Sequence, residues 1–164
     1  MDFTTYRDML EQRLQRHFDL EKDFHYQNMK IDLLAKYYAR NERYIATKKA
    51  TVYAFENNEY VFVKNFDKIE REGLNQFTDM LKKSIDSFVN PHDEHMSTLI
   101  TGVVVVNEEY EPEILELVKK FKHHKSFAFG FKGWVDIALV LVILQHNEVI
   151  TNRKGKEVQK AYRL

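Results

Sequence analysis

The segment NPHDEHM, residues 90–96, places four ionisable side chains in a row between a helical stretch and a very apolar one. Imidazole nitrogens and carboxylate oxygens ligate Zn, Mn and Fe in proteins, and the same groups carry protons in acid–base catalysis. Pro91 favours a loop, in which these residues form only a polar connector. Two interpretations therefore stay open: a connector, or a divalent-metal or acid–base site. The candidate residues of such a site are His92, Asp93, Glu94 and His95.

A second candidate site lies in FGFKGWVD, residues 129–136, where two glycines flank a lysine among aromatic rings. Glycine allows a backbone to approach a ligand closely, and aromatic rings can stack on bases. Asp136 stands one step inside an apolar strand, where an unpaired carboxylate is costly. We therefore expect it at the end of the sheet or paired with a cation such as Lys132. Lys132, Trp134 and Asp136 are candidate ligand-binding residues; the alternative is a turn or bulge with Trp134 packed against the core.

The charges balance over the whole chain, with 25 basic and 25 acidic residues, but not locally. Residues 36–49 and residues 151–164 each carry an excess of four positive charges. The zero net charge argues against nucleic-acid binding, whereas the two local clusters argue for it. A commoner explanation of such clusters is solvated strand ends and a frayed C-terminal tail, here residues 152–164. The candidate nucleic-acid-binding residues are Arg40, Arg43, Lys48, Lys49, Arg153, Lys154 and Lys156.

Composition and motifs exclude several kinds of site. The chain has no cysteine, which removes disulfides, thiol nucleophiles and Cys-based zinc sites. It has no GxSxG motif, phosphate loop or dinucleotide fingerprint, so we expect no Ser-His-Asp arrangement. Residues 1–10 are polar and acidic, unlike a signal peptide, and the longest apolar run, Val135 to Leu144, is half the length of a membrane span. We expect a cytoplasmic protein with no membrane partner.

The hydrophobic spacing predicts one α/β (α+β) domain over residues 1–164. Helical spacing covers three stretches, whereas alternation or β-branched runs cover the segments between and after them. Asn57 and Asn58 predict a tight hairpin turn. We expect a single mixed sheet of about six strands with three helices, in the order α-β-β-β-α-β-α-β-β, and with the long apolar strands at its centre. The predicted helices lie at 3–18, 68–88 and 112–122, and the predicted strands begin near Phe24, Tyr44, Tyr60, Thr98, Ser126 and Val135.

The element order from residue 3 to about residue 106 resembles the core of the PD-(D/E)XK nucleases. Those enzymes bind a divalent metal for phosphodiester hydrolysis through an early acid and a Glu/Asp-x-Lys motif on a strand. Here Glu59 and Lys64 are five apart, and Asp32 and Lys36 form D-x-x-x-K, so no catalytic residue is carried over. The stretches YAFENNEYVFVK, NPHDEHM and FGFKGWVDI also resemble a family of small bacterial proteins. That resemblance implies an intact single-domain family and brings no activity with it.

Three functions fit these observations. The absence of a complete catalytic motif favours a non-catalytic binding module of bacterial type, with a protein partner or with self-association through exposed strand edges. The basic clusters favour a nucleic-acid-binding or degenerate nuclease-like protein. The NPHDEHM segment favours a metal-dependent hydrolase, for which a divalent metal is the one cofactor that we consider. Binding is our first choice, and whether the protein is an enzyme stays open.

Overall fold

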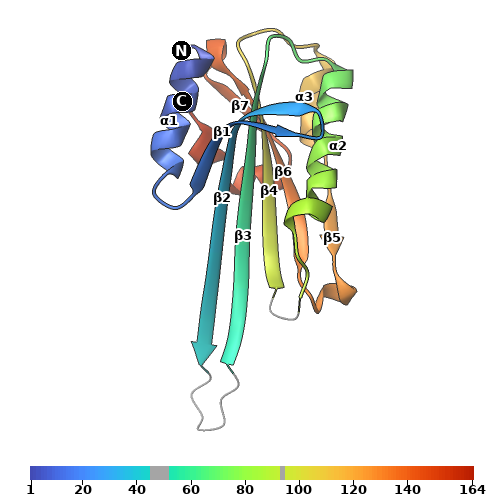
Figure 1. Ribbon diagram of the computed structural model, residues 1–164. Coiled ribbons are helices and arrows are strands. Elements are labelled where there is room, and N and C mark those ends of the chain that lie inside the picture. The colour runs from blue at the N-terminus through green and yellow to red at the C-terminus, as the bar shows by residue number, and fades with distance from the viewer. Residues whose placement is uncertain (45–51, 93–94) are drawn as a thin grey trace.

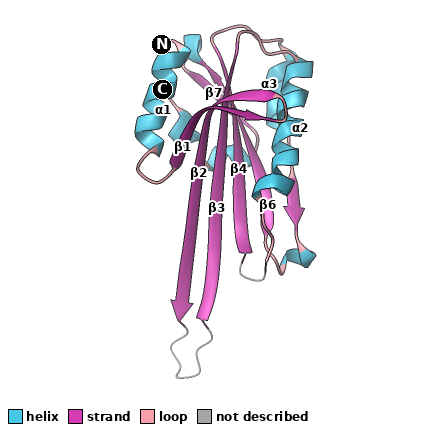
Figure 2. Ribbon diagram, viewed as in Figure 1, coloured by secondary structure: helices cyan, strands magenta, loops and turns pink. Residues whose placement is uncertain are grey.

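The computed structural model describes residues 1–44, 52–92 and 95–164, with the side chains of residues 1–39, 57–92 and 97–164. Within these residues, a mixed β-sheet of seven strands has helices packed on both faces (Figures 1 and 2). This architecture and its order of elements confirm the predicted α+β fold. The elements in chain order are α1 (Phe3–Leu14), β1 (Asp19–Tyr26), β2 (Met29–Tyr44), β3 (Val52–Phe66), α2 (Arg71–Phe88), β4 (His95–Val106), α3 (Glu113–Lys120), β5 (His124–Ser126), the 3-10 turn η1 (Ala128–Gly130), β6 (Trp134–Ile143), η2 (Leu144–His146), β7 (Glu148–Thr151), η3 (Lys154–Glu157) and η4 (Gln159–Tyr162).

The strand order is β1-β2-β3-β4-β6-β5, and β7 also pairs with β6. β1, β2 and β3 form an antiparallel meander. β3, β4 and β6 are parallel, because α2 and α3 return the chain to the same end of the sheet between these strands. β4 and β6 are buried on both faces from Ile100 to Val106 and from Ile137 to Ile143. Their nearly uninterrupted apolar sequences follow from this central position.

Two apolar layers fill the space between the sheet and its helices. α2 and α3 cover one face, whereas α1 and the C-terminal turns cover the other. α2 packs directly onto β4 at Gly102, where an added Cβ would lie 2.9 Å from the Phe77 ring and would also overlap Leu81. The helices cover the upper part of the sheet in Figure 1, and the long β2–β3 pair extends below them.

The C-terminal segment, for which we expected fraying over residues 152–164, instead folds onto the sheet. Tyr162 is buried, and its backbone carbonyl accepts a 2.7 Å hydrogen bond from the Tyr6 hydroxyl on α1. The two ends of the chain therefore lie side by side (Figure 1). Burial raises the pKa of both tyrosines above the ordinary value, so both hydroxyls stay protonated in the folded protein. The segment is ordered because it closes the apolar layer on the α1 face.

The predicted hairpin turn at Asn57 and Asn58 is wrong, because both residues lie within β3 and pair with β2. Asn57 is exposed there, so these polar residues mark an uncovered part of the sheet and not a chain reversal. The connection between β2 and β3 falls at residues 45–51, outside the described residues. The β1–β2 hairpin turns at Gln27 and Asn28, whose φ angles of 52° and 59° are those that a two-residue turn requires.

Candidate functional site

The register of the sheet brings three ionisable side chains onto one face. Asp136 of β6 pairs with Leu99 of β4 on one side and with His124 of β5 on the other. Leu99 in turn pairs with Glu59 of β3. Residues that are directly opposite in neighbouring strands share a face. His124, Asp136 and Glu59 therefore form a row across the lower part of the sheet.

Asp136 is held between His124 and Lys154. Its Oδ1 lies 2.6 Å from Nδ1 of His124, and its Oδ2 lies 3.7 Å from Nζ of Lys154 on η3. Lys154 also lies 2.9 Å from a carboxylate oxygen of Glu157. The hydrogen bond to Glu157, followed by the charge of Asp136, raises the pKa of the Lys154 ammonium. The expectation that Asp136 needs a partner fits this geometry, although the partners are His124 and Lys154, where we had suggested Lys132.

Asn152 fixes the turn that carries Lys154. β5 and β7 both pair with β6, and the side chain of Asn152 fills the gap between them. Its Oδ1 accepts hydrogen bonds from the backbone N–H groups of Leu139 and Gly155, at 2.9 and 2.8 Å. Its Nδ2 donates to the carbonyls of Phe121 and Ile137, both at 3.1 Å. Asn152 is 1% exposed, so one buried amide joins β6, η3 and the segment after α3.

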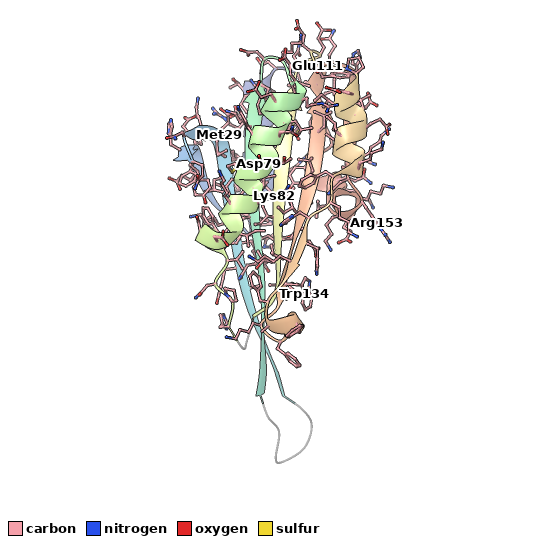
Figure 3. The ribbon with its side chains drawn as sticks, turned by 90° about the vertical axis from the view of Figure 1, so that its right-hand side faces the viewer. Met29, Asp79, Lys82, Glu111, Trp134 and Arg153 are labelled. Carbon is pink, nitrogen blue, oxygen red and sulfur yellow. The ribbon has the colours of Figure 1, made fainter. Side chains whose placement is uncertain are left out.

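A cavity of about 320 Å³ lies between the segment after α3, the start of β6 and η3. Phe121, Ile137 and Asn152 contribute to its wall, and Arg153 projects below the end of α3 (Figure 3). Burial and the nearby charge of Lys82 lower the pKa of His123, so this lining residue is neutral at pH 7. The cations that line the cavity are Lys119, Lys120, Lys122, Arg153 and Lys154, and the carboxylates are Asp136 and Glu157.

The positive charge of this cavity is only partly neutralised. Lys119 pairs with Glu116 on α3, and Lys154 pairs with the two carboxylates of the cavity itself. Over residues 1–44, 52–92 and 95–164 the structure shows no ion pair for Lys120, Lys122 or Arg153. Unpaired cations around a concave wall attract anions. The cavity can therefore accept a small ligand that carries negative charge.

His124 makes a second contact that the sequence motifs did not predict. Its Nε2 lies 3.1 Å from Oγ of Ser126, so Ser126, His124 and Asp136 are joined in the order that a base uses to activate a hydroxyl. Our expectation of no Ser-His-Asp arrangement is thus wrong, because the three side chains are in contact. Both His124 and Ser126 are exposed on the edge strand β5, where water competes for these hydrogen bonds. We assign the pair to positioning Asp136.

The comparisons with known proteins give one match. A family model described as a domain of unknown function (DUF8052) covers residues 2–164. The chain belongs to this family. Membership of DUF8052 confirms the predicted family without an assigned activity, and leaves the function to be argued from the site. Comparison with curated proteins gave no match, and comparison with solved structures gave none either.

The other ligand-binding candidates of this DUF8052 chain lie near the same face. Trp134 starts β6, two residues before Asp136, and lies well below Arg153 in Figure 3. It is half-buried and lines a second cavity, of about 300 Å³, which Asp136, Glu59 and Lys154 also line. Lys132 is exposed in the turn between η1 and β6. The structure thus brings Trp134 and Asp136 together and places Lys132 in the neighbouring turn.

The metal hypothesis for NPHDEHM stays a prediction. His92 lies in the loop after α2, and His95 begins β4, but the His95 side chain is not described. Asp93 and Glu94 lie outside the described residues. In the described part of the DUF8052 chain, no group of three His, Cys, Asp or Glu side chains is arranged to hold a metal ion.

The two basic clusters lie in different parts of the molecule. Arg40 and Arg43 belong to β2, where the backbone alone is described, and Lys48 and Lys49 lie outside the described residues. The C-terminal cluster is instead gathered beside the lysines at the end of α3. Arg153 and Lys156, together with Lys119, also line a neighbouring cavity of about 620 Å³. The candidates predicted from the sequence include Arg153, Lys154 and Lys156 but not Lys119, Lys120 and Lys122, which lie in α3 and just after it.

Proposed function

We propose that the protein is a non-catalytic binding module for a small anionic ligand, which occupies the 320 Å³ cavity beside Asp136. The observation that carries this proposal is the excess of cations in the cavity wall. Lys119 and Lys120 offset the negative end of the α3 dipole. The charges that remain for a ligand are those of Lys122 and Arg153, because Lys154 pairs with Asp136 and Glu157.

The shape of the site suits a small molecule. A volume of about 320 Å³ lies at the lower end of the range for ligand pockets. Its wall combines the apolar side chains of Phe121 and Ile137 with the cations at its rim. Such a wall favours an anion that also has an apolar or planar part, as an organic phosphate or carboxylate has. The ligand class that we propose is therefore a phosphate-bearing small molecule.

Thermal denaturation tests this proposal, because a ligand that binds only the folded state raises the melting temperature by mass action. Inorganic phosphate, pyrophosphate and a nucleoside diphosphate should each raise it, whereas a neutral sugar should not. The double variant Lys122→Ala and Arg153→Ala should lose this shift. Lys22→Ala, which removes an exposed cation from β1 at the opposite edge of the sheet, should keep it. A flat response of the wild-type protein to all three anions would overturn the proposal.

Nucleic-acid binding is a second candidate. It is favoured by the extension of the basic surface from the 320 Å³ cavity to the neighbouring one, which share Lys119 and Arg153. A phosphate backbone could follow such a surface, and its binding would weaken steeply with salt. Fluorescence anisotropy of a labelled single-stranded oligonucleotide at low and at moderate salt measures this. Loss of binding in the Lys156→Ala variant, which leaves the 320 Å³ cavity intact, would distinguish this candidate from the small-ligand site.

A further inference from the structure

The turn between β5 and β6 presents two phenylalanine rings to solvent. Phe129 is 101% exposed and Phe131 is 83% exposed. The other exposed large apolar side chains in the described residues, Met1 and Tyr38, are 54% and 62% exposed. Phe side chains are usually among the most buried of all. Two of them, largely solvated and separated only by Gly130, are the feature of the described surface that most needs a partner.

The backbone, and not ring packing, holds these side chains outward. Ala128 and Phe129 have positive φ angles of 49° and 55°, and Gly130 follows at 92°. Positive φ angles are strained for residues other than glycine and persist only where the surroundings fix them. Here the N–H groups of Gly130 and Lys132 donate to the carbonyl of Phe127, at 2.9 and 3.2 Å. These bonds close the turn, so its tip, Phe129–Phe131, is a preformed projection.

Two lysines belong to this turn and to the strand before it. Residues 123–134 contain Lys125 and Lys132, and no aspartate or glutamate. Lys125 lies over the ring of Phe127, 5.4 Å from its centroid, at the base of the turn. One exposed carboxylate, that of Asp86 on α2, lies 3.8 Å from Lys125. The tip is therefore apolar at its end, with Lys125 at its base and Lys132 directly after the second ring.

We infer that the Phe129–Phe131 tip inserts into the surface of an anionic lipid bilayer. Lipid interfaces bind small apolar projections that lysines flank, because the rings enter the acyl boundary while the ammonium groups meet anionic headgroups. A stable protein interface buries about 800 Å² on each partner, far more than two rings supply. Trp134, which follows the turn, is the kind of side chain that lies at headgroup depth. A surface contact of this kind needs no membrane-spanning segment. It departs from our expectation of no membrane partner. The inference does not depend on the proposed anion cavity.

Vesicle binding tests this inference directly. The full chain should co-sediment with vesicles of phosphatidylcholine and phosphatidylserine, and not with phosphatidylcholine alone. Trp134 is the only tryptophan, so its emission should shift to shorter wavelength on binding. The double variant Phe129→Ser and Phe131→Ser should lower the partition coefficient at least about tenfold, because burial of even one Phe ring is worth that factor.

The matched control is Tyr38→Ser, which removes another exposed aromatic ring, on β2 away from this turn, and should bind as the wild type does. Since Phe129 and Phe131 are solvated, their double variant should keep the wild-type melting temperature. A wild-type protein that stays in the supernatant with both vesicle types would overturn the inference. So would unchanged binding by the double variant. Concentration-dependent dimers that form without lipid, and that the double variant loses, would assign the tip to a second copy of the chain and overturn the lipid assignment.

Discussion

Lys154 and Asp136 lie on different elements, η3 and β6, yet Nζ of Lys154 is 3.7 Å from the Asp136 carboxylate. This contact joins the C-terminal turns to the row of polar side chains on the sheet. Asp136 and Glu157 are the two carboxylates in the wall of a cavity that five cations also line. Asp136 therefore orients Lys154 and, at the same time, weakens the attraction of the cavity for anions.

The Asp136→Asn variant should bind pyrophosphate more tightly than the wild type. The change removes one negative charge from the cavity wall, and Glu157, 2.9 Å from Lys154, still holds that ammonium group. A charge interaction at such a partly exposed site is worth up to about 1 kcal/mol, which corresponds to roughly fivefold in affinity. Isothermal titration calorimetry measures this. Asp79→Asn on α2, outside the cavity, should leave the affinity unchanged, and weaker binding by Asp136→Asn would contradict the assigned role.

The Asn152→Ala variant should unfold about 3 kcal/mol more easily than the wild type. The substitution leaves four backbone groups, on Phe121, Ile137, Leu139 and Gly155, without their side-chain partner. Each unsatisfied buried group costs about 1–3 kcal/mol unless water replaces the amide. Urea denaturation of Asn152→Ala should be compared with that of Asn75→Ala, an exposed position on α2. Equal stabilities of the two variants would show that the amide does not hold η3.

The Gly102→Ala variant should be less stable by about 2 kcal/mol. The added methyl group would overlap Leu81 and lie 2.9 Å from the Phe77 ring, so α2 must move away from β4. Gly73 is the matched control, because a Cβ there would meet Ile69 at an ordinary 3.4 Å. Gly73→Ala within α2 should raise stability by up to about 1 kcal/mol. Chemical denaturation of both variants should show a lower free energy of unfolding for Gly102→Ala and a higher one for Gly73→Ala.

The difference in stability between the Glu59→Gln variant and the wild type should depend on pH. Burial raises the pKa of the Glu59 carboxyl above its ordinary value. The folded protein therefore holds this proton more tightly than the unfolded chain does, and ionisation at rising pH costs the folded state free energy. Glutamine stays neutral, so Glu59→Gln should melt higher than the wild type at neutral pH and equally near about pH 4. Glu148→Gln, an exposed change on β7, should show no such pH-dependent difference from the wild type.

Much of the architecture could be predicted from the sequence because its apolar runs are long and regular. The β-branched run of β4 and the helical spacing of α2 each identify one element without ambiguity. The turns were harder, since Asn57 and Asn58 have turn chemistry but lie in an uncovered stretch of β3. A local preference cannot show which part of a strand the helices leave exposed, because that depends on the lengths of all the packed elements.

The site was only partly predictable. Asp136 could be found, because a carboxylate inside an apolar strand signals a partner. Its contact with His124 depends on the pairing of β5 with β6, which the residues around His124 do not indicate. Asn152 belongs to no hydrophobic period. A single polar residue after a strand is also common, so its sequence position does not single it out. Long-range contacts such as these are set by the sheet topology.

Calorimetric titration of pyrophosphate is the most direct test of the proposed anion site. The account predicts measurable binding to the wild-type protein and to Lys22→Ala, weaker binding at higher salt, and none to the double variant Lys122→Ala and Arg153→Ala. The double variant must also keep the wild-type melting temperature, so that lost binding is not lost folding. Absence of binding to the wild type, or equal binding to the double variant, would contradict the assignment of the cavity as an anion site.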